Sequence, residues 1–232
     1  MRPFWPTGTS WKWSASWGAA EVTPSREEFY QALAQRHGTE RQARFQAARV
    51  AVCGLGGLGS NIAIMLARAG VGALHLIDFD RVDLSNLNRQ QYFVEQLGQL
   101  KTEALPATLR HVAPYCAVTS QTLEVTPESI PGLFDGCDVI CEAFDRAEAK
   151  AMLVQGALEY YPDTPLVSGV GMAGLDSANA IRTRRVGRGL YLCGDGVSDS
   201  GAGLPLISSR VTVCAAHQAT MILRLLAGER EP

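Results

Sequence analysis

Apolar and polar positions change along the chain in a way that predicts strands and helices in alternation. Short runs of consecutive aliphatic residues are typical of strands buried on both faces, and apolar residues three or four positions apart are typical of helices. We expect strands at about 49–53, 73–77, 118–123, 138–142 and 165–169, and helices at about 24–37, 39–47, 60–69, 101–113, 127–134, 146–160 and 210–226. This order predicts an α/β fold, a Rossmann-like doubly wound and mainly parallel sheet with helices on both faces.

The pattern changes after residue 169. Residues 178–186 have strand character and follow a Gly-rich stretch, which predicts a C-terminal mixed or antiparallel extension of the sheet. Residues 187–203 contain six glycines, so we expect a mobile loop there. Strand and helix signals recur without a linker-like interruption, which predicts a single domain over residues 23–228.

Residues 1–22 differ from the rest of the chain. They contain all four tryptophans among Ser, Thr, Gly and Pro, with a spacing that fits neither a helical stripe nor a strand alternation. We expect a flexible Trp-rich tail. The alternative is an aromatic docking segment for a partner or a second copy, because exposed tryptophan is costly unless something covers it.

Composition narrows the class of protein. The chain has 232 residues, 47% of them hydrophobic and 19% charged, which excludes a largely disordered protein. A formal net charge of −2 provides no overall basic field for nucleic acid, and no uncharged apolar run approaches the length of a membrane span. Six cysteines without a signal-type apolar run favour reduced thiols and a cytoplasmic location.

A Gly-rich loop lies between the first predicted strand of the sheet and the helix after it. Gly54-Leu-Gly-Gly-Leu-Gly59 matches the pattern G-x-G-x-x-G, which lets the backbone approach phosphates at a helix N-terminus. Asp78 ends the next strand, where a carboxylate accepts hydrogen bonds from ribose hydroxyls. These features fit a dehydrogenase and an adenylate-forming enzyme equally well.

The polar block 78–91 separates these alternatives, because a dehydrogenase has no use for it. Arg89 offers a planar fork of donors to a triphosphate, and Asn86 and Asn88 offer groups for phosphate or ribose oxygens. Lys101 adds a point charge for the phosphates. Asp145 follows a predicted strand and lies at the carboxyl edge of the sheet, where an acid suits magnesium held by phosphates and waters.

These motifs resemble one family. GLGGLGS, LIDFDRVDLSNLNRQ, GQLK and EAFD, in this order, are similar to the ThiF/MoeB/ubiquitin-activating-enzyme superfamily, and most of all to ThiF-type adenylyltransferases of sulfur-carrier proteins. The likeness runs from about residue 36 to 168, with a looser tail to about 228. It implies a nucleotide-binding core at about 49–169 and a carrier-binding part at about 170–228.

The resemblance also implies a reaction. The C-terminal glycine carboxylate of a small ubiquitin-like carrier, similar to ThiS, would attack the α-phosphate of ATP to give an acyl-adenylate and pyrophosphate, in thiamine or related sulfur-transfer biosynthesis. ATP and Mg²⁺ would be required, and a homodimer is expected. This hypothesis involves no nucleic acid and no membrane.

Site residues follow from the resemblance position by position. Arg36, supplied by the partner subunit of a dimer, would act with Arg89, Lys101 and Asp145 in catalysis, and Asp145 would bind Mg²⁺; Arg41 and Arg44 are alternatives for the arginine. The expected nucleotide-binding residues are Gly54, Gly56, Gly57, Gly59, Asp78, Asp80, Ser85, Asn86, Asn88, Arg89, Lys101, Asp145 and Arg146.

The chain departs from relatives in two respects. Many relatives bind zinc through two C-x-x-C pairs, and this chain has no such pair, so we expect no structural zinc. Some have Asn immediately after the magnesium Asp, where this chain has Arg146. Cys193 lies in the predicted mobile loop and is a candidate acceptor of the activated carrier, as a thioester or related sulfur adduct. The alternative is a semi-buried thiol without a chemical role.

Two other functions stay open at this point. The same fold could activate a tRNA base, or a small-molecule carboxylate or carbonyl, by adenylation. The chain could also be a non-catalytic scaffold or dimer partner, although Arg89, Lys101 and Asp145 together argue against a degenerate site.

Overall fold

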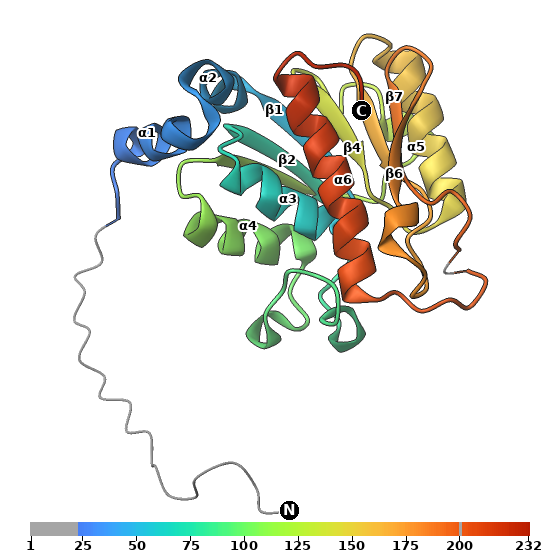
Figure 1. The fold of residues 1–232 in the computed structure, drawn as a ribbon. Helices are drawn as coiled ribbons and strands as arrows, with labels where there is room; N and C mark the ends of the chain where they lie inside the picture. The colour runs from blue at the N-terminus through green and yellow to red at the C-terminus, as the bar shows by residue number, and fades with distance from the viewer. Residues whose placement is uncertain (1–22, 200) are drawn as a thin grey trace, which may run out of the picture.

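The computed structural model describes residues 23–199 and 201–232, which form a seven-stranded sheet covered by helices (Figure 1). The strand order is β3-β2-β1-β4-β5-β7-β6, and every neighbouring pair is parallel except β6 and β7. The strands are β1 (Arg49–Cys53), β2 (Ala73–Asp78), β3 (Ala117–Thr122), β4 (Val139–Glu142), β5 (Leu166–Gly169), β6 (Arg182–Val186) and β7 (Leu190–Gly194). The predicted Rossmann-like fold with a mixed C-terminal extension is confirmed. The predicted N-terminal tail lies outside the described residues.

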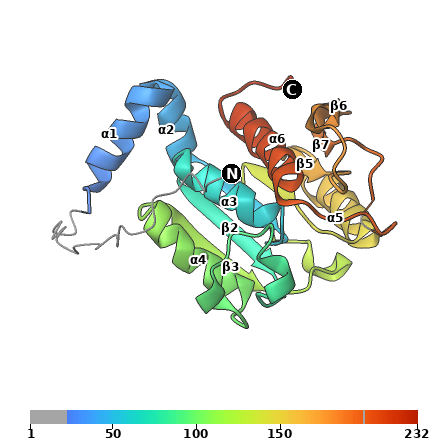
Figure 2. The same ribbon diagram turned by 60° about the horizontal axis from the view of Figure 1, so that its bottom comes forward.

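Helices cover the two faces of the sheet unequally. The helices are α1 (Arg26–His37), α2 (Thr39–Ala47), α3 (Gly59–Arg68), α4 (Lys101–Val112), α5 (Ala147–Tyr160) and α6 (Ser208–Leu226). Helices α3, α4 and α6 lie on one face and α5 on the other (Figure 2). Helices α1 and α2 lie at the edge of the sheet where the parallel strands begin (Figure 1). There the N–H of Ala73, at the start of β2, donates to the carbonyl of Ala48, just after α2. None of the described helices has the length and apolar character needed to cross a membrane.

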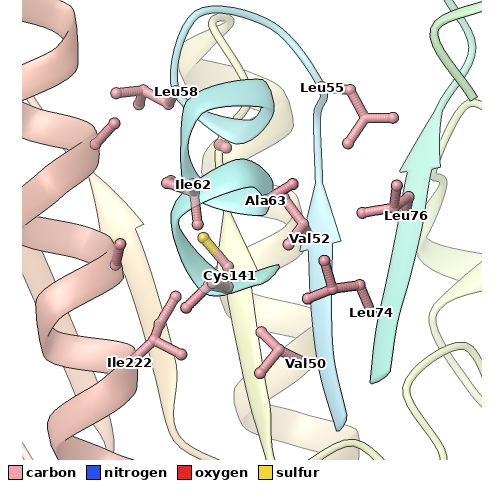
Figure 3. Packing of buried hydrophobic residues seen from close by; sticks show 14 of the residues in the cluster. Val50, Val52, Leu55, Leu58, Ile62, Ala63, Leu74, Leu76, Cys141 and Ile222 are labelled. Carbon is pink, nitrogen blue, oxygen red and sulfur yellow. The ribbon is translucent and has the colours of Figure 1, made fainter. Parts of the chain in front are cut away.

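The core consists of two apolar layers, one on each face of the sheet. Successive residues of β1 point to opposite faces. Val50 and Val52 pack under α3 (Figure 3), and Ala51 and Cys53 belong to the apolar layer on the other side. Ile62 and Leu66 of α3 are four residues apart and fully buried against the sheet. Burial of each such side chain contributes about 1.5–3 kcal/mol, so the β1–α3 unit is held firmly.

The C-terminal region differs from its prediction. Residues 190–194 were expected within a mobile loop, but they form β7, which lies between β5 and β6. Tyr191 is fully buried in this strand and its hydroxyl donates to the carbonyl of Arg230 at 2.9 Å. Gly187 and Gly189 form only the turn before the strand. The predicted helix at 127–134 is likewise a single 3-10 turn, Pro127–Ser129, because the residues after it turn inward to pack in the core.

A buried ion pair fastens the segment between β7 and α6. Arg210, in the first turn of α6, donates to a carboxylate oxygen of Asp195 at 2.5 Å, and both side chains are almost fully buried. Arg210 also donates to the carbonyls of Ala173 and Ser177, so one guanidinium joins three parts of the C-terminal region. Asp195 in turn accepts the backbone N–H of Val197 at 2.8 Å. The loop on this side of the molecule is therefore anchored at a fixed point.

We expect Asp195→Asn to destabilise the protein by about 3 kcal/mol at neutral pH, because it leaves a buried guanidinium without a counter-charge. Burial alone would raise the pKa of Asp195, but backbone N–H groups and Arg210 outweigh it and lower the pKa from 3.8 to about 2. The stabilisation is therefore complete above pH 3.8 and is lost as the pH falls through about 2. Urea unfolding at pH 7, 4 and 2 should show that the difference in free energy of unfolding between Asp195→Asn and wild type becomes smaller as the pH falls.

Asp163→Asn is the matched control, since Asp163 is an exposed loop carboxylate. Its effect should be small and nearly independent of pH. A constant difference between Asp195→Asn and wild type over this pH range would contradict the assignment of the buried pair.

Candidate nucleotide-binding site

A cavity of about 600 Å³ opens at the carboxyl edge of the sheet. It lies where the chain order reverses, between β1, which continues to β2, and β4 on the other side of β1. Ligands of open α/β sheets bind at such a switch point. The predicted nucleotide-site residues that line the cavity are Gly54, Gly56, Gly57, Asp78, Asp80, Asn86, Arg89, Lys101, Asp145 and Arg146.

The glycine loop has little room for side chains. Gly54 has a φ of +88°, and a Cβ there would lie 2.8 Å from the carbonyl oxygen of Ala143. A Cβ on Gly57 would meet a methyl group of Val211 at 3.0 Å. Gly59 has another role, because a Cβ there would lie 1.7 Å from the carbonyl oxygen of Gly54. Gly59 therefore allows α3 to pack on the loop, and it does not line the cavity.

The loop is held by buried polar groups beneath it. Asp78 accepts the N–H of Leu55 at 2.6 Å on one carboxylate oxygen and the N–H of Asp80 at 2.7 Å on the other. The hydroxyl of Tyr92 donates to the carbonyl of Leu55 at 2.8 Å, and burial raises the pKa of Tyr92, so this donor keeps its proton. Each oxygen of Asp78 has a further lone pair available for a ligand hydroxyl.

Hydrogen bonds tie the polar block to the glycine loop. The amide of Asn61 on α3 donates to the carbonyl of Gly57 at 2.7 Å and to that of Arg89 at 3.0 Å. The Arg89 guanidinium donates to the Ser85 carbonyl at 3.2 Å and to the Asn88 side chain at 2.8 Å. Ser85 and Asn88 do not line the cavity. They orient the arginine that does.

Lys101 begins α4 and its ammonium is buried at the cavity wall. Its Nζ lies 2.7 Å from a carboxylate oxygen of Asp80, with 5% of the Lys101 side chain and 50% of the Asp80 side chain exposed. The N–H of Lys101 also donates to the carbonyl of Asp80 at 3.0 Å. This double attachment places a positive charge before any ligand arrives, which is what a site for developing negative charge requires.

Asp145 lies in the turn after β4, on the other side of the cavity, with its side chain exposed. Arg146 follows it and forms an exposed ion pair with Glu124 at 3.1 Å. An exposed carboxylate in the wall of a cavity that also contains a glycine loop suits Mg²⁺, which keeps several waters and takes its other ligands from phosphates. No cluster of three His, Cys, Asp or Glu side chains suited to a metal occurs among residues 23–199 and 201–232. The fit therefore depends on the nucleotide supplying oxygens.

Besides Gly59, Ser85 and Asn88, two further predicted residues do not line the cavity. Arg36 is exposed near the end of α1, at the amino edge of the sheet, so it does not reach the cavity of its own chain. Cys193 is fully buried in β7, with Thr183 Oγ1 at 3.5 Å from its sulfur. Burial raises the pKa of Cys193 to about 11, although the contact with Thr183 lowers it slightly. The expectation of an exposed thiol in a mobile loop is wrong, because this residue belongs to the sheet.

Sequence reasoning missed several residues of the cavity wall. Gln90 lines it and has a buried side-chain oxygen without a partner among the described residues. Lys150 of α5 also lines it. Segments 170–172 and 196–199 line it as well, and they lie within the part of the chain that was predicted to bind the carrier. Gln90 lies within the polar block 78–91 and could have been predicted as a site residue on that ground. Lys150 carries no signal in the sequence, because its role depends on a buried acid that is found only in the fold.

The fold and cavity together define a class of protein: a Rossmann-like α/β domain with a glycine loop and cationic side chains at the switch point of its sheet. The ThiF family model matches residues 30–232, and the chain belongs to the ThiF family. The predicted family is thereby confirmed.

Relatives within the family differ in name and length. The chain is 31% identical to the molybdopterin-synthase adenylyltransferase of Salmonella typhimurium, over 83% of this chain and 78% of the relative. It is 36% identical to the tRNA threonylcarbamoyladenosine dehydratase of Bacillus subtilis, over 59% of this chain and 54% of the relative. It is 34% identical to the adenylyltransferase and sulfurtransferase Uba4 of Aspergillus terreus, over 66% of this chain but only 30% of the relative. Two of these relatives are adenylyltransferases by name, which supports the predicted class, nucleotidyltransferase.

Solved structures support the fold. The E. coli dehydratase TcdA in complex with ATP superposes with a TM-score of 0.79 at 22% sequence identity, covering 89% of this chain and 98% of that one.

Proposed function

We propose that this protein uses ATP to adenylate the C-terminal carboxylate of a small ubiquitin-like sulfur-carrier protein, releasing pyrophosphate. The observation that carries the proposal is the convergence of Arg89, Lys101 and Asp145 on one cavity beside the glycine loop. Three charged groups of this kind around one cavity suit transfer of a nucleotidyl group. Thiamine or related sulfur-transfer biosynthesis is the pathway we propose for it.

In this reaction a carrier carboxylate oxygen bonds to the α-phosphorus of ATP, and the bond from that phosphorus to the pyrophosphate oxygen breaks. The carboxylate is already a nucleophile, so no general base is required. The glycine loop would hold the phosphates and Asp78 the ribose. Arg89 and Lys101 would stabilise the negative charge that develops on the departing pyrophosphate, since both are fixed in place beforehand. Asp145 would hold Mg²⁺, which supplies further charge compensation on the phosphates.

Segments 170–172 and 196–199, together with Leu206 and Val211, form the cavity wall contributed by the C-terminal part of the chain. Both segments contain a glycine and both are attached to Asp195, whose N–H donates to the carbonyl of Gly171 at 3.0 Å and whose carboxylate accepts the N–H of Val197. We propose that the extended tail of the carrier lies along them, with the folded body of the carrier outside the cavity. The relationship to the molybdopterin-synthase adenylyltransferase and to Uba4 supports a protein acceptor.

A second candidate is adenylation of a tRNA base. It is favoured by the 36% identity to the B. subtilis dehydratase. It has less support, because that match covers 54% of the relative whereas the adenylyltransferase match covers 78%.

Exchange of labelled pyrophosphate into ATP tests the proposal. The assay contains Mg²⁺ and, in turn, purified ubiquitin-like proteins ending in Gly-Gly, the same proteins without the last glycine, and tRNA. We expect exchange only with an intact carrier, and we expect Asp145→Ala to lower it about a hundredfold or more. Exchange that requires tRNA instead would establish the second candidate. ATP binding without exchange in any mixture would favour a scaffold.

The same assay examines the proposed homodimer, in which Arg36 of one subunit completes the site of the other. Arg36→Ala and Asp145→Ala should each be inactive alone. When mixed under conditions of subunit exchange they should regain activity, because one of the two sites in a mixed dimer is intact. If Arg36→Ala retains full activity, Arg36 has no catalytic role.

A further inference from the structure

Glu142, at the carboxyl end of β4, is fully buried, although it is a carboxylate. One of its oxygens accepts the N–H of Phe144 at 2.6 Å, and the other accepts the hydroxyl of Ser168 at 2.5 Å. The ammonium of Lys150, on α5, lies 3.0 Å from both oxygens. Every described contact of this carboxylate is therefore with groups of the protein itself, and it has no exposed surface with which to bind a ligand.

Lys150 connects this buried acid to the cavity. Its side chain is 19% exposed, and the residue lines the same cavity as Asp145. Two of the three N–H donors of an ammonium suffice for the two oxygens of Glu142. An apolar pair of similar size often stabilises a core as well as a buried ion pair does. The presence of the charges therefore needs an explanation other than stability.

The pair encloses the turn that carries Asp145. Glu142 precedes the turn and bonds to the N–H of Phe144 within it, and Lys150 follows it on α5. The turn also has a fixed neighbour, because the carbonyl of Ala143 lies against Gly54 with no room for even a Cβ between them. Two contacts therefore restrain the backbone immediately before Asp145: the hydrogen bond from the N–H of Phe144 to Glu142, and the packing of Ala143 against Gly54 of the glycine loop.

The neighbouring ion pair does not provide this constraint. Arg146 and Glu124 are 63% and 59% exposed, and exposed pairs contribute at most about 1 kcal/mol. Water competes for both partners. The buried pair of Glu142 and Lys150 is shielded from water, so it can keep the turn in place when Asp145 binds Mg²⁺.

We propose that Lys150, acting through Glu142, is a positioning residue that fixes Asp145 for the magnesium-bound nucleotide. The inference rests on the proposed role of Asp145 in holding Mg²⁺. Lys150 neutralises the buried carboxylate, the carboxylate holds the N–H of Phe144, and the turn presents Asp145 to the phosphates in one orientation. Loss of such a supporting contact typically lowers metal affinity or activity about 10–100-fold.

The test is calorimetric binding of ATP with Mg²⁺ and with EDTA to wild type, Lys150→Met, Lys150→Arg and Leu109→Ala. Leu109 is a fully buried residue of α4 outside the cavity, so its truncation lowers stability without touching the site. We expect Lys150→Met to lose about tenfold in affinity for ATP with Mg²⁺ and little in EDTA. Lys150→Arg should restore most of the loss, and Leu109→Ala should bind as wild type does in both conditions.

The outcomes separate the two proposals. If wild type gains affinity from Mg²⁺ and Lys150→Met gains as much, the positioning role is overturned while the proposed function stands. If Mg²⁺ gives wild type no gain, the role of Asp145 fails and the positioning role with it. Should Lys150→Met not fold, Ser168→Ala removes one bond to Glu142 and should give a smaller loss of the same kind; an unchanged gain from Mg²⁺ in that variant would also overturn the proposal.

Discussion

Replacing Gly59 with alanine should prevent stable folding. The added Cβ would lie 1.7 Å from the carbonyl oxygen of Gly54, which is a backbone atom, and both glycines are buried where β1 leads into α3. No side chain can move to relieve this contact, so α3 would have to separate from the loop. We expect a loss of about 4 kcal/mol or more in the free energy of unfolding, measured by urea denaturation of the soluble fraction.

Gly56→Ala is the control for this substitution. A Cβ there meets only the side chain of Gln90 at 3.7 Å, which is ordinary contact. This variant should fold with nearly normal stability and lose affinity for ATP, because the methyl group faces the cavity. Alanine is the better helix former by about 1 kcal/mol, so helix propensity cannot explain a loss at Gly59, the first residue of α3. A Gly59→Ala protein as stable as wild type would show that α3 does not pack as described.

Replacing Lys101 with methionine should leave the protein folded and lower kcat/KM for pyrophosphate exchange by about 10²–10³-fold. The half-exposed Asp80 regains water when its partner is lost, so the cost in stability is small. The substitution removes the ammonium charge that Asp80 holds at the cavity wall before the nucleotide binds. The effect should fall mainly on kcat, because charge on the departing pyrophosphate is greatest in the transition state.

Arg81→Met is the control for Lys101→Met. It also removes one positive charge, from a residue that pairs with Leu100, next to Lys101. Arg81 is exposed and donates to the carbonyl of Gly98 at 2.8 Å, outside the cavity. This variant should keep nearly full activity. If both variants lost the same activity, the total positive charge near the cavity would matter, and not the position of the Lys101 ammonium.

The nucleotide-binding half was predictable because its signals are local. The loop from Gly54 to Gly59 needs only a strand before it and a helix after it, and both are evident in neighbouring residues. Asp78 and Asp145 were placed correctly at the carboxyl edge because Asp78 ends one buried strand and Asp145 lies three residues after the end of another. Parallel strands bring such ends together whatever lies between them.

The C-terminal half was less predictable because its order comes from distant contacts. Cys193 lies in a segment whose glycines favour a loop, yet pairing with both β5 and β6 makes it a buried strand residue. Arg210 and Asp195 form an ion pair that no spacing in the chain indicates. Arg36 belongs to the last turn of α1, and the position of this helix at the amino edge of the sheet likewise depends on how the helix packs (Figure 1).

Local patterns in the chain were thus sufficient to predict the strands β1 to β5, the glycine loop after β1 and the charged residues that line the cavity beside it. Tertiary structure decided which charges are buried. Glu142 and Lys150 are three positions before and five positions after Asp145, and nothing in that spacing shows that one is fully buried and the other lines a cavity. The physical reason is that backbone turns and helix starts depend on adjacent residues, whereas the desolvation of a charge depends on every element that packs around it.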